Sequence, residues 1–143
     1  MKVLFVCVGN SCRSQMAEGF ARAYGSDVVE PFSAGLAPAG GIAPETKKVM
    51  LEKNIDLEMQ FPKDLRLVAP GTMDLVINLS GYQLPEGWQD VREWVIRDPM
   101  GQNEKFHRQI RDEVESRVMD LLLDLRHRAA ADERPPRLGR QRI

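Results

Sequence analysis

The N-terminal stretch KVLFVCVGNSCRSQMAEGFARAY, residues 2–24, places a short polar loop between an apolar run and a segment with helical periodicity. Residues 2–8 are typical of a buried strand, and residues 14–24 repeat apolar side chains at the spacing of a helix. A loop between a strand and a helix presents several backbone N–H groups and the positive end of the helix dipole to one point in space. The sequence therefore predicts an anion-binding site at residues 7–13.

The residue types in this loop suit such a site. Gly9 and Asn10 tolerate left-handed backbone angles, which allow successive amides to turn inward. Arg13 supplies a planar fork of donors that matches a tetrahedral oxyanion. Cys7 lies at the base of the loop, where the positive field favours the thiolate, which is the nucleophilic form of cysteine. The remaining residues of the predicted substrate-binding loop are Val8, Ser11, Cys12 and Ser14.

Strand-like and helix-like segments alternate along the rest of the chain. Strand-like runs cover residues 2–8, 27–35, 73–80 and 91–96, and helical patterns cover residues 14–24, 43–54 and 103–128, with a brief helix within 62–68. This alternation predicts an α/β fold, a doubly wound four-stranded parallel sheet with helices on both faces. Ligands of such sheets bind beyond the carboxyl ends of the strands, where the loop after the first strand lies.

The length of 143 residues and the 43% hydrophobic composition predict one domain with a proper core. We assign residues 1–128 to this domain and residues 129–143, which are rich in Arg and Pro, to a flexible basic tail. No apolar run approaches the length of a membrane span, and no signal-peptide pattern precedes the first strand. We therefore expect a cytoplasmic protein without a membrane partner, and the net charge of −1 predicts no nucleic-acid partner.

Several other kinds of site are not expected. Both cysteines lie inside the loop, so they cannot connect distant parts of the fold as a disulfide framework. The two histidines are far apart in the sequence, which argues against a zinc site. No Gly-Lys-Ser/Thr sequence follows the loop, which argues against a nucleoside triphosphate site.

The segment CVGNSCRS resembles the phosphate-binding loop of the low-molecular-weight protein tyrosine phosphatases and of the thioredoxin-coupled arsenate reductases that share their fold. Its continuation QMAEGFAR is more similar to the arsenate reductase branch. The resemblance extends from Lys2 to about Leu125. It implies that Cys7 is the nucleophile and that Arg13 binds the oxyanion and stabilises the transition state. It also implies that Ser14 donates its hydroxyl to the Cys7 thiolate and that Asn10 maintains the loop.

Asp98, in the segment VIRDPMG, is the candidate proton donor for the leaving group. It follows the last strand-like run and precedes the last helix, which places it at the same end of the sheet as the loop. An Asp before Pro is also a common start of a turn. The resemblance implies the catalytic role, because the matching Asp-Pro of the family supplies the general acid.

The resemblance also implies a cation site, although no other cofactor is expected. Asn10, Glu18, Ser33 and Asp64 match by position a group of residues that binds a potassium ion near the loop in some arsenate reductases. Glu18 is equally suited to be an ordinary exposed residue of the first helix.

The chain departs from both branches of this family. Phosphatases of the family usually line the pocket with aromatic residues, whereas this chain has Met100 and the aliphatic segment GLAPAGGIAP at those positions. The thioredoxin-coupled reductases use two further cysteines after the third strand. This chain has Ser80 at the first of these positions and no cysteine after Cys12, so that relay cannot operate.

Three functions are consistent with these residues. We favour a phosphatase that hydrolyses phosphate monoesters through a thiophosphate on Cys7. The alternatives are an arsenate reductase that completes turnover with an external thiol, and a non-catalytic oxyanion-binding module. The expected partners are phosphate, arsenate or a phosphorylated substrate, together with a thiol reductant in the second case. A disulfide between Cys7 and Cys12 is a further option that would protect Cys7 from irreversible oxidation.

Overall fold

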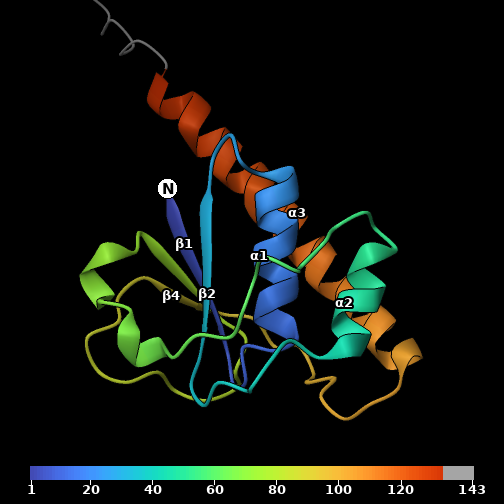
Figure 1. Cartoon of the computed structure of the whole chain (residues 1–143). Coiled ribbons are helices and arrows are strands. Elements are labelled where there is room, and N and C mark those ends of the chain that lie inside the picture. The colour runs from blue at the N-terminus through green and yellow to red at the C-terminus, as the bar shows by residue number, and fades with distance from the viewer. Residues whose placement is uncertain (134–143) are drawn as a thin grey trace, which may run out of the picture.

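The computed structural model describes residues 1–133 and has a four-stranded parallel sheet at its centre (Figure 1). The strands β1 (Lys2–Cys7), β2 (Glu30–Gly35), β3 (Leu75–Asn78) and β4 (Val91–Glu93) are arranged in the order β2-β1-β3-β4. The α-helices are α1 (Arg13–Tyr24), α2 (Pro44–Leu51) and α3 (Glu104–Glu133), and two short 3₁₀ helices are η1 (Leu65–Leu67) and η2 (Pro70–Thr72). The predicted α/β fold with its parallel sheet is confirmed.

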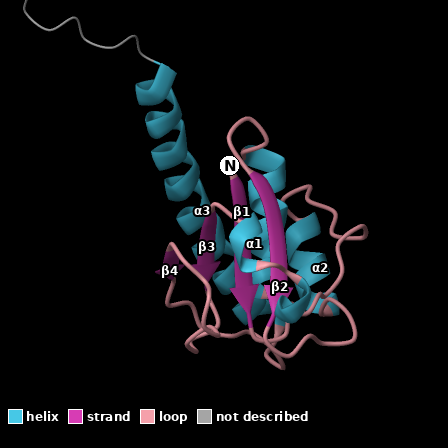
Figure 2. Ribbon diagram, turned by 90° about the vertical axis from the view of Figure 1, so that its left-hand side faces the viewer, coloured by secondary structure: helices cyan, strands magenta, loops and turns pink. Residues whose placement is uncertain are grey.

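The two faces of the sheet are covered differently (Figure 2). One core cluster joins β1, β3 and the segment after β4 to the buried sides of α1, α2 and α3. A smaller cluster on the other face includes Leu65 of η1 together with Val68 and Trp88 from loops. Helices thus lie on both faces, but the helix that contributes to the second cluster, η1, is a single 3₁₀ turn. Pro70 and Gly71, which follow η1 in the chain, disfavour its extension into a longer α-helix.

The carboxyl ends of the strands meet at one edge of the sheet, as the arrowheads in Figure 2 show. The register pairs Cys7 with Gly35 and Val6 with Asn78, so the chain leaves β1, β2 and β3 at nearly the same level. The loop from Cys7 to Arg13 lies at this edge, as the strand-loop-helix pattern predicts.

Helix α3 is longer than its sequence pattern indicates. It continues to Glu133, so the predicted start of the tail at residue 129 falls inside the helix (Figures 1 and 2). The reason is the run Ala129–Ala131, because alanine has the highest helix propensity of all residues. The rest of the predicted tail, residues 134–143, lies outside the described residues.

Helix α3 packs against both α1 and α2. Leu122 of α3 is fully buried and lies against Gly25, at the end of α1. At the other end of α3, Arg111 is buried and donates to the carbonyl oxygen of Val49 at 2.9 Å and to the carboxylate of Glu52 at 2.6 Å. In the part of the chain that the structure describes, no helix has both the length and the apolar character that a membrane span requires.

The adjacent residues Leu122 and Leu123 test this packing. Leu122→Ala removes a buried side chain, and we expect it to lower the free energy of unfolding by about 2–5 kcal/mol. Leu123 is 51% exposed, so Leu123→Ala should change it by less than about 0.5 kcal/mol. Urea unfolding followed by circular dichroism measures both values. Similar losses in the two variants would contradict the orientation of α3.

Candidate active site

The backbone of the loop after β1 is held by the segment that follows β2. The amides of Leu36, Ala37 and Ala39 donate to the carbonyl oxygens of Cys7, Val8 and Gly9 at 3.1, 2.8 and 2.9 Å. In a trans peptide the carbonyl of one residue and the N–H of the next point in opposite directions. The N–H groups of residues 8–10 therefore point away from the 36–39 segment, into the concave side of the loop.

Two residues allow this close arrangement. Asn10 has a φ of 48°, in the left-handed region that Asn tolerates better than most residues. Gly35, at the end of β2, has no space for a side chain, because a Cβ there would lie 2.8 Å from the carbonyl oxygen of Val8 and 3.0 Å from the amide nitrogen of Asn10. The loop is thus packed directly onto the backbone of the neighbouring strand.

Cys7, the last residue of β1, lies at the base of the loop and is 3% exposed. Its Sγ is 2.8 Å from the hydroxyl of Ser14, in the first turn of α1. The same hydroxyl oxygen accepts a hydrogen bond from Asn10 Nδ2 at 2.8 Å. Because Ser14 Oγ is already an acceptor for Asn10, its O–H is free to donate to the sulfur.

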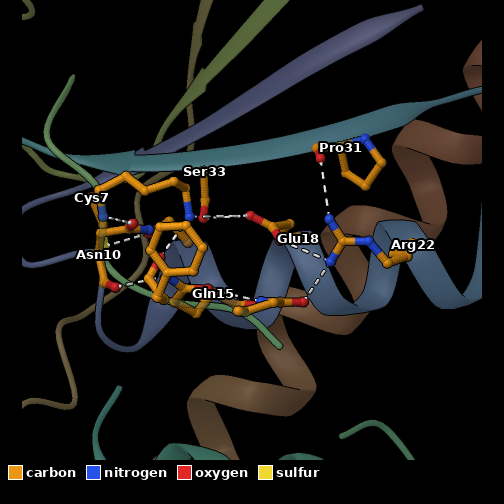
Figure 3. A network of polar contacts seen from close by, with 11 residues as sticks. Cys7, Asn10, Gln15, Glu18, Arg22, Pro31 and Ser33 are labelled. Atoms are coloured by element: carbon orange, nitrogen blue, oxygen red, sulfur yellow. Dashed lines mark hydrogen bonds and ion pairs between the residues drawn. The ribbon is translucent and has the colours of Figure 1, made fainter. Parts of the chain in front are cut away.

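Asn10 connects the loop to its surroundings (Figure 3). Its side-chain oxygen accepts from the amide of Lys63 at 2.8 Å, and its backbone oxygen accepts from Gln15 Nε2 at 3.0 Å. Gln15 is fully buried and also donates to the carbonyl of Phe61. We did not predict these roles of Gln15 and Lys63, because their contacts join segments that are far apart in the sequence.

Arg13 is buried, and its guanidinium group is fixed by the ends of the sheet. Nη1 donates to the carbonyl oxygens of Leu79 and Ile96 at 2.5 and 2.9 Å, and Nη2 lies 3.5 Å from Asp98 Oδ2. Its Nε is buried without a hydrogen-bond partner among the described residues. An unpaired buried N–H is costly, so this atom is suited to an oxyanion in the loop.

Asp98 lies near Arg13, with its side chain about half exposed. Its Oδ1 accepts from the amide of Met100 at 3.0 Å, a contact that fixes the turn after Pro99. Met100 and Ala39 flank the loop, since a Cβ on Gly9 would lie 3.9 Å from Met100 Cε and 3.8 Å from Ala39 Cβ. The wall near Gly9 therefore consists of small and aliphatic groups.

The side chains of Ser11 and Cys12 contact the protein behind the loop. Ser11 donates to the carbonyl of Gly41 at 2.9 Å and accepts from the amide of Ala43 at 3.0 Å. Burial raises the pKa of the Cys12 thiol to about 11, and the nearby Cys7 and Asp98 also raise it, whereas a hydrogen bond with Thr46 lowers it. Cys12 is therefore a protonated thiol at neutral pH.

The four residues of the predicted potassium site do not form a cation site here. Glu18 is buried, accepts from Ser33 at 2.7 Å, pairs with Arg22 at 2.8 Å and lies 3.8 Å from Lys63 Nζ (Figure 3). Its negative charge is thus already balanced by two side chains. Asp64 pairs with Arg66 at 2.7 Å, which also lowers the pKa of Asp64.

A potassium ion near Glu18 would have to displace these positive groups, so the residues do not fit it. Within residues 1–133, no group of three or more His, Cys, Asp or Glu side chains is placed to hold a metal ion.

Comparisons with known proteins agree with this arrangement. The family model described as low molecular weight phosphotyrosine protein phosphatase matches residues 2–131. A protein of Synechocystis sp. named glutaredoxin arsenate reductase is 38% identical over 126 residues, which cover 85% of this chain and 95% of that protein.

Solved structures of an arsenate reductase and of a phosphatase are also similar to this chain. A structure described as an arsenate reductase in the phosphate binding state has a TM-score of 0.79 and 33% identity, and the match covers 87% of this chain and 98% of that one. The structure of the YwlE arginine phosphatase from Geobacillus stearothermophilus has a TM-score of 0.83 and 25% identity, and the match covers 94% of this chain and 98% of that one. The chain belongs to the low-molecular-weight phosphotyrosine protein phosphatase family, whose members among these neighbours include both arsenate reductases and a phosphatase.

Proposed function

We propose that this chain is a cysteine-dependent phosphatase that hydrolyses phosphate monoesters through a thiophosphate intermediate on Cys7. The inward N–H groups of the loop and the unpaired Nε of Arg13 supply donors for the phosphoryl oxygens. The hydroxyl of Ser14 stabilises negative charge on the Cys7 sulfur. These groups act on any tetrahedral oxyanion, so a separate observation must distinguish the phosphatase from the reductase.

In the first step, the Cys7 thiolate attacks phosphorus, and the bond between phosphorus and the ester oxygen breaks. Asp98 gives its proton to that oxygen, which leaves as an alcohol. In the second step, Asp98 takes a proton from a water molecule, whose oxygen attacks phosphorus and displaces the Cys7 thiolate. The products are phosphate and the regenerated enzyme. The position of Asp98 beside Arg13, with its side chain half exposed, supports both of its roles.

The observation that favours the phosphatase is the absence of a resolving cysteine beyond the loop. The chain contains two cysteines, Cys7 and Cys12. At the expected position after β3, Ser80 donates to Asn78 Oδ1 at 2.6 Å and accepts from the amide of Tyr82 at 3.1 Å. Ser80 therefore stabilises a turn, and a serine cannot form a disulfide. Hydrolysis needs no such residue, because water removes the phosphoryl group.

The second candidate is an arsenate reductase that uses an external thiol. It is favoured by the identity of 38% to the glutaredoxin arsenate reductase of Synechocystis sp.. In this reaction Cys7 would displace hydroxide from arsenate and form an arsenic(V) adduct. An external thiol would then attack the Cys7 sulfur, and arsenic would leave as arsenite with the two electrons of the broken bond. A mixed disulfide would remain on Cys7.

The walls of the site favour substrates without a large aromatic group. Ala39 and Met100 beside Gly9 offer no ring, so an aryl substrate loses stacking worth roughly 0.5–1.5 kcal/mol per aromatic pair. We therefore infer that small or flexible phosphate monoesters are better substrates than phosphotyrosine.

Replacing Cys7 tests the nucleophile. Cys7→Ser should abolish hydrolysis of a small aryl phosphate, because the serine hydroxyl is a far weaker nucleophile than a thiolate. Phosphate binding should persist, since its donors are Arg13 and the backbone of the loop. Steady-state kinetics and titration calorimetry measure the two properties. The matched control is Cys12→Ser, which we expect to retain hydrolysis, and equal loss in both variants would contradict the assignment.

Replacing Asp98 tests the proton donor. Asp98→Asn keeps an oxygen for the amide of Met100 but cannot donate the proton, so turnover should fall by about 10²–10⁴-fold. The loss should be smaller for a phosphate ester whose leaving group is stable as an anion. The measurement compares two aryl phosphates of different leaving-group acidity. A loss that does not depend on the leaving group would assign Asp98 a structural role.

Arsenate separates the two candidate functions. We expect steady hydrolysis of phosphate esters without any thiol, and no arsenite production above background with thioredoxin, its reductase and NADPH. Arsenite production that requires glutaredoxin or a low-molecular-weight thiol would instead support the second candidate. Efficient arsenite production with thioredoxin, its reductase and NADPH would overturn the phosphatase assignment.

A further inference from the structure

The backbone carbonyls of the loop after β1 are held from outside the concave side, and most of them are held by backbone amides. The carbonyl oxygens of residues 7, 8, 9 and 11 accept from the amides of residues 36, 37, 39 and 43. The carbonyl of Asn10 differs, because it accepts from a side chain, with Gln15 Nε2 at 3.0 Å. A substitution of Gln15 can therefore release one peptide of the loop and leave the others held.

The hydrogen bond from Gln15 sets the direction of the next N–H group. Because a peptide unit is planar and trans, the N–H of Ser11 points away from the side where the carbonyl of Asn10 is bound. Gln15 is fully buried and lies between the loop and the carbonyl of Phe61, behind the concave side (Figure 3). The N–H of Ser11 therefore points into the concave side, together with those of residues 8–10.

The side-chain amide of Gln15 is restricted to one of its two orientations. Its Nε2 carries two hydrogens, which are donated to the carbonyl oxygens of Asn10 and Phe61, each at 3.0 Å. Its Oε1 accepts from Gln60 Nε2 at 2.8 Å. The reverse orientation would place Oε1 against two carbonyl oxygens in a buried position, where acceptors without donors are costly.

Gln60 is oriented in turn by Arg22, an exposed residue of α1. A guanidinium group only donates, and Arg22 Nη1 lies 2.7 Å from Gln60 Oε1. The Nε2 of Gln60 therefore faces Gln15, where it donates to the side-chain and backbone oxygens at 2.8 and 3.1 Å. Glu18 holds the guanidinium in place by pairing with Arg22 at 2.8 Å. A directed series of hydrogen bonds thus runs from the surface to the carbonyl of Asn10.

We propose that Gln15 and Gln60 are positioning residues of the anion site, which direct the N–H of Ser11 toward a phosphoryl oxygen. The proposal rests on the proposed function, because it concerns the same loop and the same substrate oxygens. Gln15 acts through the peptide between Asn10 and Ser11, and Gln60 acts through Gln15. An N–H group that is already oriented needs no reorganisation when negative charge develops in the transition state.

Replacing Gln15 tests the buried amide. Gln15→Met fills a similar volume but donates no hydrogen bond, and we expect phosphate to bind about 10–100-fold more weakly, the effect of losing a hydrogen bond to a charged group. The value of kcat/KM for phosphate esters should fall by a similar factor whatever the leaving group, since the N–H of Ser11 acts on the phosphoryl oxygens that do not leave. Titration calorimetry and steady-state kinetics measure the two properties. Unchanged phosphate affinity would overturn the proposal.

The amide of Ser11 gives a readout that a general disturbance of the loop would not imitate. In nuclear magnetic resonance of the isotope-labelled chain, the N–H signals of Gly9, Asn10 and Ser11 should shift downfield at saturating phosphate. In Gln15→Met the shift of Ser11 should shrink while the other two persist, because the carbonyls before them are held by backbone amides. An unchanged shift of Ser11, or an equal loss at all three amides, would contradict the positioning role.

Replacing Gln60 tests the same series of hydrogen bonds at a half-buried position. In Gln60→Glu the carboxylate keeps the pairing with Arg22 but cannot donate to Gln15. It instead competes with the carbonyl of Asn10 for the N–H groups of Gln15, and a charged acceptor forms the stronger hydrogen bond. We expect weaker phosphate binding and a smaller shift of Ser11. A side chain that served only to anchor Arg22 would be replaced by glutamate without loss.

Two controls separate this effect from the added negative charge. Gln109→Glu adds the same charge at an exposed position of α3 and should leave phosphate binding unchanged. In the background of Gln15→Met, Gln60→Glu should have no further effect, because the residue through which it acts is gone. A charge that simply repels phosphate would weaken binding equally in both backgrounds, and that result would exclude Gln60 from the positioning role.

Phosphate binding and the N–H signal of Ser11 are measured without turnover. If the chain hydrolyses no phosphate ester but Gln15→Met shows the selective loss at Ser11, the proposed function alone fails. If the chain hydrolyses esters and the selective loss is missing, the positioning role alone fails. A chain that binds no phosphate would contradict both. Circular dichroism and urea unfolding verify that each variant is folded.

Discussion

The site depends on three hydrogen bonds between the loop after β1 and the segment after β2. The amides of residues 36, 37 and 39 bind the carbonyls of residues 7, 8 and 9 on the outer side of the loop. Because the peptide unit is planar and trans, fixing these carbonyls also fixes the direction of the next three N–H groups. The concave array of donors is therefore a consequence of how β1 and β2 are paired. Gly35 is essential to it, since any side chain there would collide with the loop backbone.

Two buried charged side chains near this loop, Arg13 and Glu18, are paired in different ways. The guanidinium of Arg13 is held on one side by the carbonyls of Leu79 and Ile96, and its Nε is left without a partner. Glu18, by contrast, has its charge balanced by Arg22 and Lys63. An unpaired buried N–H is costly, so Arg13 Nε is the donor that a negative ligand in the loop would satisfy.

Phosphatases and arsenate reductases of one family can share such a loop because the first step is common to both. In each, a cysteine attacks a tetrahedral oxyanion that is held by the same donors. They differ in what removes the adduct, and this depends on residues outside the loop. In this chain the segment after β3 carries Ser80 in a hydrogen-bonded turn, and a single second thiol, Cys12, lies within the loop itself. Cys12 forms a hydrogen bond with Thr46 of α2, whose hydroxyl lies 3.2 Å from Nδ1 of His107 in α3.

The sequence by itself determined the parallel α/β fold, the strand-loop-helix unit and the candidates Cys7 and Arg13, because periodicity and loop composition are local properties. Ser14 and Asp98 became candidates through the resemblance to the family and, for Asp98, through its place after the last strand-like run. The sequence did not determine that α3 reaches Glu133 or that the helix packed on the second face of the sheet, η1, is a single 3₁₀ turn. Only the tertiary structure showed the partners of Glu18. The resemblance matches this residue to a cation site, whereas its carboxylate is paired with Arg22 and Lys63. The tertiary structure alone joined Cys12, Thr46 and His107, because side chains separated by 34 and 61 positions meet only when three helices pack on one face of the sheet.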